Sequence, residues 1–128
     1  MKFKKLAGVW ALLLGVGVLT FSGKGFADST VQLFSITGLV SDATQYNGCL
    51  IKISPGPQTI FPGCTAGLVT LGCDGAAGPS KTAAATNWSA AQLAFVTSTK
   101  SYIRIYDVAP EGNPYCLADR VDNTKFPQ

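Results

Sequence analysis

The side chains in this sequence that could do chemistry are carboxylates and cysteines, because none of the 128 residues is a histidine. Without an imidazole there is no histidine-based triad and no cysteine–histidine pair. Paired carboxylates can hydrolyse glycosides, and four acids near the end of the chain are candidates: Asp107, Glu111, Asp119 and Asp122. We interpret Asp107 and Glu111 as the flanks of a turn and the other two as solvated. We therefore predict a protein that is not an enzyme and has no catalytic residues.

Four cysteines are the other reactive groups: Cys49, Cys64, Cys73 and Cys116. An even number of cysteines in a small exported chain indicates disulfides formed in an oxidising compartment. Zinc is the alternative, but the sequence has no CxxC pair and no imidazole ligand. We predict two disulfides, no metal and no other cofactor.

One loop has the composition of a sugar-binding site. Tyr46 lies in the segment Thr44-Gln45-Tyr46-Asn47-Gly48, just before the first cysteine. Proteins hold sugars by stacking on an aromatic ring and by hydrogen bonds from hydroxyl and amide groups. Thr44, Tyr46 and Asn47 are therefore our candidate ligand-binding residues, and an ordinary loop tyrosine is the alternative.

The start of the chain is typical of a secretory signal. A basic opening is followed by an apolar run over residues 6–21, and Gly25-Phe26-Ala27 presents small residues where a signal peptidase cleaves. The apolar run is shorter than the roughly 20 residues that cross a bilayer. We predict a signal peptide over residues 1–27 and a single domain over residues 28–128, secreted or periplasmic, with no membrane span.

The charge of the chain belongs mostly to this signal. Residues 1–27 contain four lysines and no acid, so their removal takes the formal net charge from +3 to −1. The remaining basic residues are scattered singly and offer no patch for a phosphate backbone. We predict that nucleic acid is not a partner.

Hydrophobic periodicity predicts the elements that position these residues. Strands are expected over residues 30–40, with a bulge or bend at Gly38, and over residues 49–54, 68–71, 102–108 and 115–121, with the last two antiparallel. The helix is expected from Asn87, as its cap, to about Thr99, and residues 81–86 could extend it. Asn87-Trp88-Ser89 also fits a glycosylation acceptor, but a cap followed by a buried indole explains it better. Trp88 and Phe95 are expected in the core.

A turn at Pro55-Gly56-Pro57 follows the second predicted strand. If Ser54 faces Thr59 across this turn, equal steps back along both arms place Cys49 opposite Cys64, close enough for a disulfide.

The order of these features resembles a known family. It runs from a strand to Gly-Cys-Leu-Ile-Lys-Ile, then Cys64 after a hairpin, then Trp88 opening a helix that ends in Ser-Thr-Lys and continues as Tyr-Ile-Arg-Ile-Tyr. This layout resembles the pentameric B subunits of subtilase-cytotoxin and pertussis-like AB toxins, and small secreted bacterial proteins of similar layout.

The resemblance implies a mainly β fold with one helix (α+β), an OB-like five-stranded antiparallel barrel. It also implies glycan or cell-surface receptor binding by a homo-oligomeric ring, with sugar contacts at Thr44, Tyr46 and Asn47. It favours a Cys49–Cys64 disulfide, which leaves Cys73 with Cys116. The competing pairing joins Cys64 to Cys73 and leaves Cys49 with Cys116, and the sequence leaves both open.

Two functions follow as expectations. The first is a secreted, non-enzymatic binding module, glycan- or receptor-binding like a toxin B subunit. The second is a small envelope protein-interaction or inhibitor protein, whose glycine-rich segment over residues 63–78 would be the exposed loop.

Overall fold

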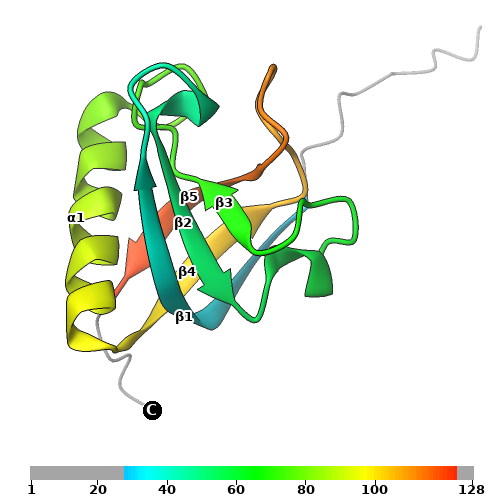
Figure 1. Ribbon diagram of the computed structural model, residues 1–128. Helices are drawn as coiled ribbons and strands as arrows, with labels where there is room; N and C mark the ends of the chain where they lie inside the picture. Colours follow the sequence, from blue (N-terminus) through cyan, green and yellow to red (C-terminus); the bar gives the residue numbers. More distant parts are fainter. Residues whose placement is uncertain (1–27, 124–128) are drawn as a thin grey trace, which may run out of the picture.

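The computed structural model describes residues 28–123, and the predicted signal peptide over residues 1–27 lies outside the described residues. The chain is mainly β with one α-helix, as predicted (Figure 1). Its elements, in chain order, are β1 (Ser29–Ser41), β2 (Cys49–Ser54), β3 (Leu68–Thr70), α1 (Lys81–Thr97), β4 (Lys100–Tyr106) and β5 (Cys116–Asp122). Within residues 28–123, no helix is long and apolar enough to cross a membrane.

The five strands pair in the order β1-β2-β3-β5-β4, and β4 pairs again with β1, so the sequence of pairings is closed. The long strand β1 makes this possible, because its first half pairs with β4 and its second half with β2. The register shifts between Ile36 and Gly38, which confirms the bulge predicted at this glycine. β4 and β5 are antiparallel, as predicted.

The prediction of an antiparallel-only sheet is wrong, because β3 and β5 pair in parallel through Val69–Cys116 and Thr70–Leu117. A parallel pair needs a long crossover connection. Here α1 and β4 supply that connection, so the sheet is mixed.

The core lies inside the strands and under the helix. Strand alternation sends one set of side chains inward, and Ile103 and Ile105 of β4 lie on one buried face, as predicted. The other fully buried large apolar residues of the strands and their ends are Phe34, Ile51, Val69 and Leu71.

Helix α1 includes the predicted extension over residues 81–86, so its predicted cap at Asn87 is wrong. Ser80 is its cap, and its hydroxyl accepts a hydrogen bond from the Ala83 N–H at 3.1 Å. Asn87 is therefore inside the helix and not at its end. Its buried amide instead binds the backbone of β5: the Nδ2 group donates to the Asp119 carbonyl at 2.8 Å, and Oδ1 accepts from the Val121 N–H at 3.1 Å.

The two aromatic residues of α1 differ in burial. Trp88, predicted to be buried in the core, is partly buried and packs against it. Phe95 is 41% exposed, so its predicted place in the core is wrong. The positions that do face the sheet are occupied by Ala84, Ala91 and Ala94, small residues that let the helix lie close to the strands.

All four cysteines form disulfides, as predicted, but the pairing differs from both predicted alternatives. The bonds are Cys49–Cys73 and Cys64–Cys116, with Cα atoms 5.7 and 5.4 Å apart. The predicted hairpin does not form, because Pro57–Thr59 is a 3₁₀ turn and no strand follows it before Leu68. β2 pairs instead with β3, so the chain leaving β3 brings Cys73 to Cys49.

Candidate ligand pocket between three loops

Three loops meet at the upper end of the molecule in Figure 1: residues 42–48 between β1 and β2, residues 71–80 after β3, and residues 107–115 between β4 and β5. A surface pocket of about 290 Å³ lies between them. Its lining residues are Thr44, Gln45, Tyr46, Asn47, Asp74, Glu111, Gly112 and Asn113. The three candidate residues from the sequence, Thr44, Tyr46 and Asn47, are thus all part of one pocket wall.

Asn47 joins the three loops. Its Nδ2 group donates to the Asp74 carboxylate at 3.1 Å, and its carbonyl oxygen accepts from the Asp74 N–H at 3.1 Å. Its Oδ1 atom accepts from the amide of Asn113 at 2.8 Å. Asn113 is only 7% exposed, and its own Oδ1 accepts from the Tyr115 N–H. The side-chain amide groups of Asn47 and Asn113 are therefore largely used in hydrogen bonds within the protein.

The backbone at Tyr46 and Asn47 is strained. Both residues have positive φ angles, 54° and 58°, although neither is glycine. Such conformations cost about 1–3 kcal/mol each and persist where the surroundings enforce them. For a bulky residue such as Tyr46 this conformation is a true outlier.

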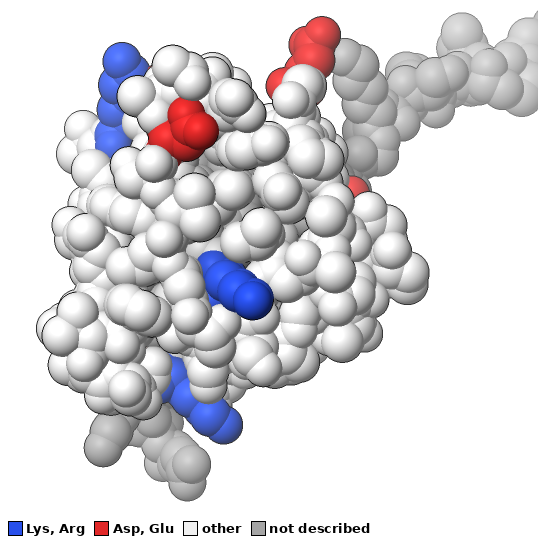
Figure 2. Space-filling view, in the orientation of Figure 1, with Lys and Arg blue, Asp and Glu red and all other residues white. Residues whose placement is uncertain are grey.

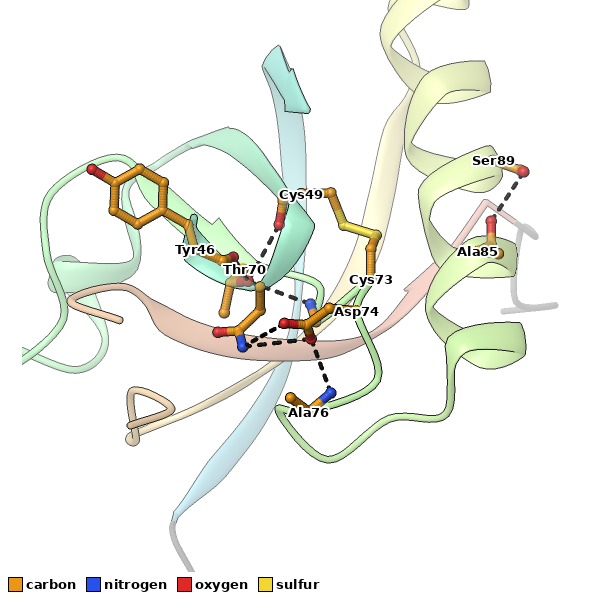
Figure 3. The surroundings of a disulfide bond; sticks show 10 residues. Tyr46, Cys49, Thr70, Cys73, Asp74, Ala76, Ala85 and Ser89 are labelled. Atoms are coloured by element: carbon orange, nitrogen blue, oxygen red, sulfur yellow. Dashed lines mark hydrogen bonds between the residues drawn. A yellow bond between two sulfur atoms is a disulfide. The ribbon is translucent and has the colours of Figure 1, made fainter. Parts of the chain in front are cut away.

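The Thr70 side chain and a disulfide hold this strained segment from below. The Thr70 hydroxyl donates to the Tyr46 carbonyl at 2.8 Å, and its oxygen accepts from the Gly72 N–H at 3.3 Å. The Cys49–Cys73 bond joins the same two segments. In Figure 3 the Tyr46 ring points away from this disulfide, whereas Asp74 lies beside it.

The Tyr46 ring is fixed by a second aromatic residue. Its centroid lies 5.2 Å from that of Tyr115, with the ring planes at 71°, an edge-to-face arrangement. Such pairs contribute about 0.5–1.5 kcal/mol beyond their buried area. Tyr46 remains half-exposed, and it is one of the residues that line the pocket.

Asp42 organises the start of the first loop. Its Oδ1 atom accepts from the Thr44 N–H at 2.9 Å, the Thr44 hydroxyl at 3.0 Å and the Gln45 N–H at 3.1 Å. These bonds, with those from Thr44 the largest, lower the pKa of Asp42 below its ordinary value. A carboxylate is therefore favoured at the base of the loop that carries Tyr46.

The four acids considered from the sequence lie in different places. Only Glu111 lines the pocket. Asp119 makes a two-pronged ion pair with Arg104, at 2.7 and 2.9 Å, and accepts from the Tyr106 hydroxyl at 3.0 Å. Asp122 pairs with Arg120 at 2.8 Å.

The pair of Asp119 and Arg104 shifts two pKa values. The hydrogen bond from Arg104 to Asp119 raises the pKa of Arg104. Burial, followed by the hydrogen bond to Asp119, raises the pKa of Tyr106. This cluster lies on the outer face of β4 and β5, and none of its members lines the pocket.

Asp107 belongs to the one group of three potential metal ligands among residues 28–123, with Cys64 and Cys116. Both sulfurs of that group are bonded to each other. A metal-binding thiolate must be free, so this cluster is not a metal site.

Five pocket residues were missed by sequence reasoning: Gln45, Asp74, Glu111 as a pocket residue, Gly112 and Asn113. The turn composition of Pro110-Glu111-Gly112-Asn113-Pro114 was visible, but nothing local showed which loop it would face. The side chains of the lining residues include an aromatic ring, hydroxyl and amide groups and two carboxylates. No protein-family model, curated protein or solved structure matches the chain.

Proposed function

We propose that this protein is an exported, non-enzymatic binding module that holds a glycan, free or on a cell-surface receptor, in the pocket between its three loops. The observation that carries the proposal is Tyr46, a half-exposed ring held at a strained backbone position beside hydroxyl and amide groups. Aromatic rings next to such groups are suited to bind sugars.

The proposal includes an OB-like barrel. Its support is the closed order of pairings β1-β2-β3-β5-β4, the parallel β3–β5 pair and the helix between β3 and β4. OB barrels bind oligosaccharides and oligonucleotides through the loops between strands 1 and 2 and between strands 4 and 5. Here these loops are residues 42–48 and 107–115, which supply most of the pocket wall.

Charge favours the saccharide over the oligonucleotide. The charged side chains that line the pocket are Asp74 and Glu111, and both are acidic. A phosphate backbone is held by Lys and Arg, and none of the lining residues is basic.

Assembly into a homo-oligomer, as in a toxin B subunit, is part of the proposal. Leu93, Phe95 and Val96 of α1 are 59%, 41% and 79% exposed, and Val31 and Leu33 of β1 are also exposed. Exposed apolar residues that gather on one element are typical of contact surfaces. Measuring the mass in solution, by light scattering after size-exclusion chromatography, tests this part alone.

The alternative, an envelope protein-interaction or inhibitor protein, was expected to use residues 63–78 as an apolar loop. None of the exposed large apolar residues of the described chain falls in that segment. An inhibitor would therefore need another surface, and the exposed face of α1 is the candidate.

The test is binding of the oxidised protein, exported by its own N-terminal segment and purified, to a broad glycan array. Tyr46→Ala should weaken binding about tenfold, which is about 1.4 kcal/mol, because the ring that stacks on the sugar is removed. Tyr102→Ala, in β4 and outside the pocket, is the matched control. Equal binding by the Tyr46→Ala protein, or no binding by the parent, would contradict the proposal.

A further inference from the structure

The pocket has an excess of hydrogen-bond acceptors. Asp74 and Glu111 present carboxylate oxygens. The side-chain amide donors of Asn47 and Asn113 already make hydrogen bonds within the protein, because Asn47 donates to Asp74 and Asn113 donates to Asn47. A ligand that donates hydrogen bonds, through hydroxyl or ammonium groups, fits these atoms better than one that accepts them.

The two carboxylates differ in their availability. One oxygen of Asp74 accepts from the Ala76 N–H at 2.9 Å and the other from Asn47 at 3.1 Å. Glu111 is exposed and makes no hydrogen bond or ion pair with any other residue of the part of the chain that the structure describes. Of the two acids that line the pocket, Glu111 is thus the one whose carboxylate oxygens are not already used within the described residues.

None of the residues that line the pocket is basic. Arg104 and Arg120 are engaged with Asp119 and Asp122 on the sheet. Lys81, at the start of α1, packs beside Gly75, but no ion pair joins it to Asp74 within the described residues. Figure 2 shows acidic side chains at the upper rim, a basic side chain at the same rim on the left, and two further basic side chains lower on this face.

Resting on the proposed glycan-binding function, we propose that this pocket accepts a neutral or amino sugar and rejects sugars that carry a carboxylate or a sulfate. Unlike charges attract and like charges repel most strongly at short range and low ionic strength. At about 290 Å³ the pocket is at the small end of ligand sites, so it holds one terminal sugar residue. Selectivity is therefore set by the charge of that residue.

The experiment compares matched oligosaccharides that differ only in their terminal group. The probes are N-acetyllactosamine, the same disaccharide capped with sialic acid, its sulfated form, and chitobiose with and without its N-acetyl groups. Affinities are measured for the exported, oxidised protein at low and at high salt. The parent should bind the uncharged or amino form of its best ligand at least about tenfold more tightly than an anionic form.

Glu111→Gln removes one charge and keeps the size of the side chain. The ratio of the affinity for the uncharged ligand to that for the anionic ligand should be about three- to fivefold smaller in this variant than in the parent. High salt should also reduce this ratio in the parent, because it screens the charges. Asp107→Asn is the matched control, because it removes an exposed acid from the same loop outside the pocket. It should leave the preference unchanged.

Three results would overturn the inference, and they are distinguishable. Binding of a sialylated or sulfated probe as tight as, or tighter than, its neutral partner contradicts the charge selectivity and leaves the glycan-binding function standing. An unchanged preference in Glu111→Gln also contradicts it. Binding of no probe by the parent overturns the proposed function, and the selectivity with it.

Discussion

Asn47 is the residue on which the geometry of the pocket depends most. Its side chain bonds to two other loops, through Asp74 and Asn113, and its backbone adopts a left-handed conformation. Asparagine suits this position because it tolerates positive φ better than most residues and carries both a donor and an acceptor. The pocket therefore requires of this one residue both a positive φ angle and side-chain hydrogen bonds to two loops.

Two substitutions of Asn47 separate the effect of its side-chain hydrogen bonds from the effect of its positive φ angle. Asn47→Gly keeps the backbone freedom but leaves the buried amide of Asn113 without its acceptor, which should cost about 1–3 kcal/mol of unfolding free energy. Asn47→Ala loses the same hydrogen bonds and adds about 1 kcal/mol for the positive φ. Urea denaturation of the oxidised proteins measures both. Equal stability of parent and Asn47→Gly would show that these bonds contribute nothing.

Asp42 predicts a pH dependence at the base of the same loop. Its pKa is lowered in the folded protein, mainly by hydrogen bonds from Thr44. Its contribution to stability is therefore present above the unfolded value of about 3.9 and is lost as the pH falls through the lowered folded value. In an NMR titration, the Asp42 carboxyl carbon and the Thr44 amide proton should shift together, with a midpoint below about 3.9.

Asp42→Asn is the control for this titration, because it keeps an acceptor oxygen and cannot titrate. The stability advantage of the parent over this variant should shrink over that acidic range. A midpoint at or above the ordinary aspartate value would contradict the prediction.

Sequence reasoning found one wall of the pocket and not the others. Thr44, Tyr46 and Asn47 are neighbours in the chain, so their shared chemistry is visible in a short window. Asp74 and Asn113 lie 27 and 66 residues from Asn47. Only the closed strand order and the Cys49–Cys73 bond bring their loops to it, and no local pattern contains that information.

At the scale of elements, α1 completes the edge of β5. β5 pairs with β3 only at its first residues, so its later backbone groups face the helix. The Asn87 side chain makes the hydrogen bonds that a neighbouring strand would otherwise make. It donates to the Asp119 carbonyl and accepts from the Val121 N–H. A helix side chain thus satisfies backbone groups that would otherwise be left unpaired.

Asn87→Ala tests this role. It leaves one donor and one acceptor of β5 without their partner and should cost about 1–3 kcal/mol for each group that stays dry. Ser89→Ala is a matched control, since the exposed Ser89 hydroxyl only donates to the Ala85 carbonyl of its own helix. Both changes also remove the Asn-X-Ser acceptor sequence. Equal melting temperatures of the two variants would therefore contradict the structural role of Asn87.

The strands were easier to predict than the helix start, for a physical reason. Alternation of large apolar residues, as at Ile103 and Ile105, is visible in sequence because the buried side chains differ strongly from their neighbours. The buried positions of α1 are mostly alanines, and these do not stand out in the alanine-rich first turns. Asn87 was assigned to the cap because its type fits a cap, although its partner is in β5.

At the scale of the whole molecule, the two disulfides stabilise different parts of the structure. Cys64–Cys116 joins residues 52 positions apart and connects the segment after β2 to β5. Cys49–Cys73 spans 24 positions and connects the start of β2, directly after the loop of Tyr46, to the loop that carries Asp74. The first bond mainly restrains the unfolded chain, whereas the second also restrains the site.

The connectivity itself can be checked by mass spectrometry of the unreduced protein. Trypsin alone leaves Cys64 and Cys73 on one peptide, because no Lys or Arg lies between Lys52 and Lys81. Chymotrypsin added after denaturation cuts at Leu68 or Leu71 and separates them. The peptide with Cys49 should then carry Cys73, and recovery of Cys49 with Cys64 or Cys116 would contradict the structure.

Each disulfide can be removed by replacing both of its cysteines with alanine. The two double variants should differ in which property suffers more, the free energy of unfolding or the ligand affinity. In the loop-closure account, loss of Cys64–Cys116 costs about 4 kcal/mol and loss of Cys49–Cys73 about 3.5 kcal/mol. Ligand affinity should follow the opposite order because, of the two disulfides, only Cys49–Cys73 lies beside the hydrogen bonds that hold the loop of Tyr46 against that of Asp74. Denaturation and glycan binding are measured on both double variants, at a temperature where both are folded. If the variant that lacks Cys64–Cys116 loses more affinity, the strained loop is held by the fold as a whole and not by the bond beside it.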